Sequence, residues 1–108
     1  MCANAVLKPE AEDTIDEGTA RAVAHRFKIL ADPTRVRLLS VLADRELCVS
    51  ELTELLDMEQ SAISHQLRTL RGLQLVRHRK VGRQVYYRLN DRYIKELLSN
   101  SLAHITAI

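Results

Sequence analysis

A change of hydrophobic period after Gly72 limits the folds open to this chain more than any other feature. Before it, apolar residues recur at helical spacing: Ile63, Leu67 and Leu70. After it, two β-prone runs, residues 75–80 and 84–89, flank a turn of residues 81–83 that contains Gly82. This pattern predicts a β-hairpin directly after a helix.

Capping residues mark where the first two helices begin. A helix is predicted over about residues 15–30, with Asp13 or Thr14 as its N-cap. A second helix is predicted from Pro33 to about Ala43. Asp32 precedes it and would accept hydrogen bonds from the free N–H groups at its start, while proline suits the first helical position.

Two short helices joined by a tight turn precede the hairpin. The first is predicted over residues 50–57 and the second over residues 61–72, where Gly72 would supply a left-handed stop. Small polar residues on the outer face of the second helix allow it to enter a major groove, so the pair indicates a helix-turn-helix. The candidate DNA contacts on this helix are Ser61, Ser64, His65, Gln66 and Arg68. Gln66 is suited to a bidentate pair with adenine.

The tip of the predicted hairpin is basic. Arg79, Lys80 and Arg83 would lie along the DNA backbone or in a neighbouring minor groove. There they would set register and salt dependence more than sequence preference. A helix-turn-helix followed by a basic hairpin is a winged helix, so the predicted fold is mainly α with a small β-hairpin.

Charge is distributed unevenly along the chain. Residues 60–92 hold eight basic residues and one acidic residue, whereas the other positions hold eight basic and thirteen acidic residues. A segregated basic region is expected of a nucleic-acid-binding protein. A pure protein-interaction module would leave this region without a role. An enzyme is not predicted, because the sequence contains no nucleophile elbow, phosphate loop or paired-histidine metal motif.

A last helix is predicted over about residues 91–106, with Asn90 as its N-cap. Its apolar stripe consists of Ile94, Leu97, Leu98, Leu102 and Ile105. So short a domain offers this stripe little to pack on, which favours a homodimer interface formed with the first helix. The alternative is an ordinary closing helix packed on its own chain.

The length of 108 residues fits one domain. Residues 1–13 are polar and acidic and are predicted to form a flexible arm, with the domain over residues 14–108. No signal peptide or membrane-spanning run is recognisable, so a cytoplasmic location is expected. In that reducing compartment Cys2 and Cys48 would be free thiols, metal ligands or redox sensors rather than a structural disulfide.

From Phe27 to about His104 the chain resembles the ArsR/SmtB family of metal-responsive repressors. Four stretches carry the resemblance: LADPTRVRLL at 30–39, ELCVSEL at 46–52, SAISHQLRTL at 61–70 and KVGRQVYYRL at 80–89. The resemblance implies a homodimer that binds double-stranded operator DNA with two inverted half-sites and releases it when an effector binds. It places DNA contacts at Gln60, Ser61, Ser64 and His65, and on the hairpin from Arg79 to Arg83. One departure is Glu59, where the family often has serine or threonine; glutamate caps a helix less well.

The resemblance also implies two possible metal sites. The first uses cysteines at the start of the helix-turn-helix, but the family's Cys-Val-Cys is Cys48-Val49-Ser50 here. Cys2 from the arm of a partner chain would supply a second thiolate, completed by His25, Glu51 or Ser50. Thiolates favour soft or borderline ions such as zinc, cadmium, lead, copper(I) or arsenite. The alternatives are a buried apolar Cys48, or a thiol-oxidation or persulfide switch.

The second implied metal site lies between the last helices of two chains. Asp91 and His104 match the family pattern, but Tyr93 and Ala107 occupy the other two ligand positions. A tetrahedral zinc site needs four N, O or S donors, or three and a water, so two ligands make this site incomplete. The alternative for His104 is a polar residue at the edge of a dimer helix.

Overall fold

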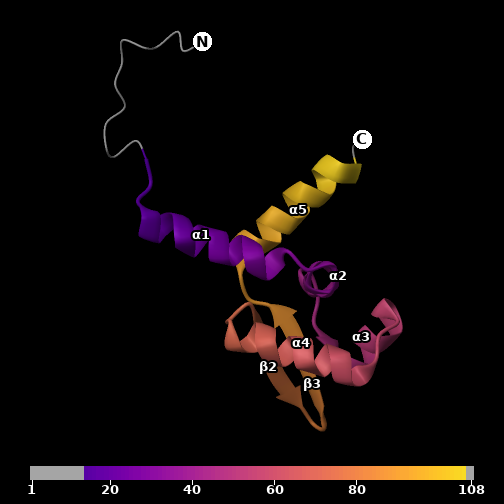
Figure 1. Ribbon diagram of the computed structural model, residues 1–108. Coiled ribbons are helices and arrows are strands. Elements are labelled where there is room, and N and C mark those ends of the chain that lie inside the picture. Colours follow the sequence, from indigo (N-terminus) through magenta and orange to yellow (C-terminus); the bar gives the residue numbers. More distant parts are fainter. Residues whose placement is uncertain (1–13, 107–108) are drawn as a thin grey trace, which may run out of the picture. The chain divides into compact units, whose positions relative to one another are not determined.

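The structure is a computed structural model that describes residues 14–106. The chain divides into two compact units, Met1–Ala31 and Asp32–Ile108. The first contains helix α1 and the second contains all the other helices and strands (Figure 1). The predicted arm at residues 1–13, with Cys2, lies outside the described residues. None of the helices within residues 14–106 is both long and apolar enough to cross a bilayer.

Helix α1 (Glu17–Leu30) is capped by Asp16 and not by Asp13 or Thr14, so that prediction was wrong. The Oδ1 of Asp16 accepts a hydrogen bond of 2.6 Å from the N–H of Thr19. The side chain of an N-cap residue bonds to the N–H two or three residues later, and Asp16 precedes Thr19 by three residues. Asp13 and Thr14 lie too far before this turn in the sequence. No side chain of α1 is buried.

Helix α2 (Pro33–Leu42) begins as predicted. The Oδ2 of Asp32 accepts a hydrogen bond of 3.0 Å from the N–H of Arg35, and Pro33 occupies the first turn. Leu38, Leu39 and Leu42 are fully buried, so α2 supplies the centre of the core in the second unit.

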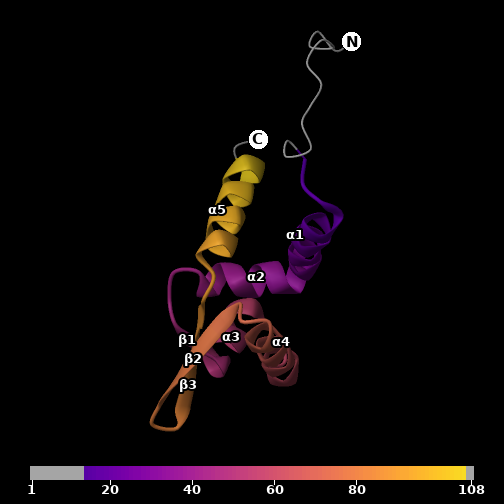
Figure 2. The ribbon, with the colours of Figure 1, turned by 90° about the vertical axis from the view of Figure 1, so that its left-hand side faces the viewer.

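Helices α3 (Val49–Leu56) and α4 (Gln60–Gly72) form the predicted helix-turn-helix and pack on each other. Asp57, with a φ of 52°, ends α3 in the left-handed conformation and lets the chain turn sharply into α4. Helix α4 covers one face of the hairpin (Figures 1 and 2). The two helices contribute these buried residues to the core: Leu52, Leu56, Ile63, Leu67 and Leu70.

The left-handed stop after α4 is Gln74 and not Gly72, so that prediction was wrong. Gln74 has a φ of 62°, while Gly72 is the last residue of the helix. The N–H of Leu75 donates to the oxygen of Leu70 at 2.9 Å, and the N–H of Gln74 donates to the oxygen of Arg71 at 3.0 Å. These two bonds form a Schellman motif. Leu70 and Leu75 are both buried, and this apolar pair selects the stop position over the glycine two residues earlier.

Strands β2 (Val76–Val81) and β3 (Gln84–Leu89) form the predicted hairpin, called the wing below. Gly82 has a φ of 61° at the first central position of the turn, which is the position that a type II′ turn reserves for glycine. A third strand, β1 (Leu47–Cys48), was not predicted because two residues carry no period. It pairs antiparallel with β3, so the sheet order is β1-β3-β2.

Helix α5 (Arg92–Thr106) is capped by Asp91, so the prediction of Asn90 was wrong. The Oδ1 of Asp91 accepts a hydrogen bond of 3.0 Å from the N–H of Ile94, whereas the Asn90 side chain donates to the oxygen of Gln74 at 3.4 Å. The α5 end and the wing tip lie at opposite ends of the second unit (Figures 1 and 2). The architecture is mainly helical with one small antiparallel sheet, as predicted.

Candidate nucleic-acid interface and effector sites

The outer face of α4 is formed by Ser61, His65 and Arg68, which follow one another at intervals of four and three residues. All three are exposed. Ile63, Leu67 and Leu70 are buried on the opposite side of the same helix. A helix places residues three or four apart on one face, so the three polar side chains point away from the core and can enter a groove of DNA.

Ser64 and Gln66 lie on the two flanks of α4 and are half-buried. Ser64 lines a cavity together with Arg68, Arg71 and Tyr87 of β3. On the other flank, the Oε1 of Gln66 accepts a hydrogen bond of 3.0 Å from the Nε of Arg35 in α2. A bidentate pair with adenine requires this same oxygen, so the structure places Gln66 differently from the freely projecting base reader that the sequence suggested.

Gln60 is exposed at the first turn of α4. It lines an open groove with Ser50 and Thr53 of α3 and with Gln84 of the wing. Glu59, the N-cap residue, makes no side-chain capping bond, in agreement with the weak cap expected from glutamate. The backbone N–H groups in the first turn of α4 therefore find no hydrogen-bond acceptor in the side chain of Glu59.

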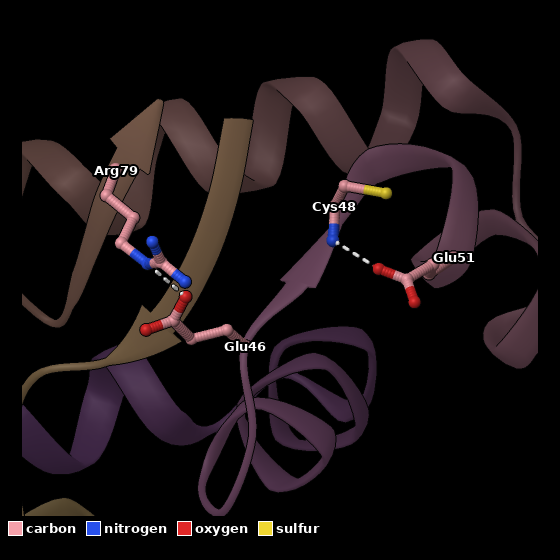
Figure 3. A network of polar contacts seen from close by, with 4 residues as sticks. All are labelled: Glu46, Cys48, Glu51 and Arg79. Carbon is pink, nitrogen blue, oxygen red and sulfur yellow. Dashed lines mark hydrogen bonds and ion pairs between the residues drawn. The ribbon is translucent and has the colours of Figure 1, made fainter. Parts of the chain in front are cut away.

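Lys80 and Arg83 are exposed at the wing tip, and neither forms an ion pair with any of residues 14–106. Arg79 differs from them. Its Nε lies 2.6 Å from the Oε2 of Glu46, the residue before β1 (Figure 3). Its guanidinium lies 6.0 Å from the centre of the Tyr86 ring. The three basic residues predicted for the wing thus divide into two unpaired cations at the tip and one that is paired within the chain.

Cys48 ends β1 and is the N-cap of α3, so it lies where the sheet meets the helix-turn-helix. It is 5% exposed, and its ladder partner is Tyr86 of β3. The Sγ lies 3.2 Å from the Oγ of Ser50. The N–H of Cys48 donates to the Oε1 of Glu51 at 3.0 Å (Figure 3), and this bond lowers the pKa of Glu51.

The described residues do not complete a metal site by themselves. Within residues 14–106, no three histidine, cysteine, aspartate or glutamate side chains cluster. Cys2, the proposed second thiolate, lies outside these residues, and His25 belongs to the other unit. Glu51 and Ser50 are therefore the two predicted co-ligands that the structure brings beside Cys48.

Asp91 and His104 stand at opposite ends of α5. The thirteen steps from residue 91 to residue 104 span about 20 Å at a rise of 1.5 Å per residue. The two side chains of one chain cannot bind the same ion, so this site needs a second chain. Asp91 also already accepts the capping bond from Ile94.

Comparison with known proteins decides the family. The model of the bacterial regulatory protein arsR family matches residues 32–78. Over 90 residues the chain is 41% identical to the HTH-type transcriptional regulator NmtR of Mycobacterium tuberculosis, which covers 83% of this chain and 75% of the relative. The chain belongs to the arsR family. It is a DNA-binding transcriptional regulator and not an enzyme.

Two further comparisons extend the likeness. The chain is 46% identical over 86 residues to the transcriptional repressor SmtB homolog of Synechocystis sp., a match that covers 80% of this chain and 65% of that relative. The crystal structure of the AntR antimony-specific transcriptional repressor matches with a TM-score of 0.80 and 34% identity, over 99% of this chain and 96% of that one. The winged-helix assignment for this arsR-family chain therefore rests on both sequence and structure.

Sequence reasoning missed Arg35 and Glu46. Both act on predicted DNA contacts, Arg35 on Gln66 and Glu46 on Arg79, from 31 and 33 residues away in the chain. No local motif signals such a contact, because the pairing depends on how α2 and β1 pack beside α4 and the wing.

Proposed function

We propose that this arsR-family protein is a homodimeric repressor that binds an operator of two inverted half-sites and releases it when a soft or borderline metal ion binds. The exposed face of α4, formed by Ser61, His65 and Arg68, is the observation that carries the DNA-binding part. This face is polar, and Lys80 and Arg83 add unpaired positive charge at the tip of the wing. The α4 helices of the two subunits would enter successive major grooves about 34 Å apart.

The apolar stripe of α5 supports dimerisation. Ile94 is buried within its own chain, but Leu102 and Ile105 on the same stripe are 59% and 67% exposed. An amphipathic helix buries its apolar stripe, so the second half of α5 requires a covering partner. A second copy of the chain is that partner in this proposal, with α1, which also leaves Val23 and Phe27 exposed, contributing to the same interface.

The effector site that we propose is centred on Cys48. This residue joins the N-terminus of α3 to β3 through its ladder pairing with Tyr86, so a ligand there acts on the helix-turn-helix and the wing together. Cys2 from the arm of the partner chain would complete the site, with Ser50 or Glu51 as further donors. AntR is antimony-specific, and a thiophilic effector for this chain agrees with a thiolate ligand.

The proposed mechanism is a shift between two dimer conformations. The metal-free dimer presents its two α4 helices at the spacing of the operator. Metal binding favours a conformation in which that spacing is wrong. A coupling of about 1–3 kcal/mol would weaken operator binding about 5- to 150-fold.

Cadmium titration of the reduced protein tests this proposal. We expect saturable thiolate-to-metal absorbance and weaker binding of a DNA duplex selected by the wild type. Cys48→Ser should abolish both effects, whereas His104→Gln should leave both unchanged. Cadmium-dependent loss of DNA binding that appears without a thiolate band, persists in Cys48→Ser and disappears in His104→Gln would place the site on α5 instead. Operator release by oxidant or persulfide, with no response to any soft metal, would replace the metal by a thiol switch.

A further inference from the structure

The hydrogen bond between Arg35 and Gln66 joins the core helix α2 to the DNA-reading helix α4. The Nε of Arg35 lies 3.0 Å from the Oε1 of Gln66, and both side chains are half-buried. The backbone of Arg35 is itself held, because its N–H donates to the capping carboxylate of Asp32 at 3.0 Å. The bond therefore starts from a fixed point at the beginning of α2.

Chemistry determines which way the Gln66 amide faces. An arginine guanidinium has donors and no acceptor, so only the amide oxygen of Gln66 can face it. The amide nitrogen then turns away from Arg35. Within residues 14–106 no other hydrogen bond of Gln66 is found, so its two N–H donors have no partner in this part of the chain.

We propose that Arg35 is a positioning residue for operator recognition, and that it fixes Gln66 with its NH₂ group as the hydrogen-bond donor offered to DNA. This inference rests on the proposed binding of the operator through α4. The ligand of that NH₂ group is an acceptor atom, either on a base edge, such as a purine N7, or on a phosphate oxygen. A lone donor does not separate adenine from guanine at N7, whereas a bidentate glutamine would select adenine.

A double-mutant cycle on operator affinity tests whether Arg35 acts through Gln66. We expect Arg35→Met and Gln66→Ala each to weaken binding of a duplex selected by the wild type about five- to tenfold, the size of one hydrogen bond. The double variant should bind no more weakly than the weaker single variant, because both substitutions remove the same bond. Arg37→Met is the matched control on the same helix, since Arg37 donates to the oxygen of Leu56 instead.

The salt dependence separates a positioning role from direct phosphate binding by Arg35. Removing a phosphate contact lowers the slope of log K against log salt by about 0.9 per contact. Arg35→Met should leave the slope at its wild-type value. A changed slope, or additive losses in the double variant, would show that Arg35 binds DNA directly and would overturn the inference.

The operator itself identifies the acceptor. Gln66→Ala relaxes the sequence preference at one position per half-site if the acceptor is on a base, and weakens all duplexes equally if it is a phosphate; both results support the donor role. Wild-type affinity in Gln66→Ala would overturn it. A wild type that binds no duplex would instead overturn the proposed function, and the Arg35 Nε–H resonance, compared between wild type and Gln66→Ala, would still report the bond.

Discussion

Arg79 and Glu46 form an ion pair across the sheet, with the Nε of Arg79 2.6 Å from the Oε2 of Glu46 (Figure 3). The two residues stand on either side of β3, and the guanidinium reaches over Tyr86 between them. The pair holds one cation of the wing within the chain. It also connects the wing to the residue that leads into β1 and Cys48.

Replacing Glu46 by glutamine should therefore release Arg79. We expect Glu46→Gln to bind operator more tightly and to steepen the slope of log K against log salt by up to about 0.9 per subunit. The free energy of unfolding should change by less than about 1 kcal/mol, because Arg79 is 65% exposed and such pairs are weak. Electrophoretic shifts at several salt concentrations measure the first effect and urea denaturation measures the second. An Arg79→Gln/Glu46→Gln variant is the control and should return the slope to the wild-type value.

Lys80 and Arg83 should behave differently from Arg79, because they lie unpaired at the wing tip. Lys80→Gln and Arg83→Gln should each lower the salt slope by about 0.9 for every phosphate that the variant no longer binds, and should weaken all duplexes to a similar degree. Arg68→Gln on α4, by contrast, should relax the preference at one base position. A wing variant that changed sequence preference and left the salt slope untouched would contradict this division of roles.

The boundaries of helices and turns could be predicted from the local sequence where a single residue determines them. Pro33 after Asp32 determines the start of α2, and Gly82 determines the wing turn, since each residue meets a backbone requirement at its own position. The start of α5 was misplaced because Asn90 and Asp91 are both good caps. Only the position of the first helical turn decides between them, and that turn depends on the burial of Ile94.

The candidate site could be predicted only as a set of residues and not as an arrangement. Ser61, His65 and Arg68 follow from helical spacing, and the structure exposes all three. Whether Gln66 and Arg79 project freely depends on partners more than thirty residues away, which no periodicity reports.

Dimerisation through α5 predicts a charge-sensitive interface. Leu102 is 59% exposed in the single chain and would be covered in the dimer, so Leu102→Glu should leave a buried, unpaired carboxylate there. We expect this variant to sediment as a monomer and to lose operator binding, because a single subunit makes only half of the DNA contacts. Ala103→Glu, at an exposed position on the side of α5 opposite the apolar stripe, is the matched control and should remain a dimer. Equal sedimentation of the Leu102 variant and the wild type would place the interface elsewhere.

Glu51 makes the stability of α3 depend on pH. Its carboxylate accepts the N–H of Cys48, and this bond lowers its pKa from the ordinary value of 4.5. A carboxyl group with a lowered pKa stabilises the folded state at pH values above its unfolded pKa, and this contribution is lost as the pH falls through the folded pKa. The difference in free energy of unfolding between wild type and Glu51→Gln should therefore be largest above pH 4.5 and should shrink in acid. Urea denaturation of both proteins across this range measures it, with Glu54→Gln, which keeps the bond to Cys48, as the control. A difference that stayed constant with pH would show that the charge of Glu51 does not act on the start of α3.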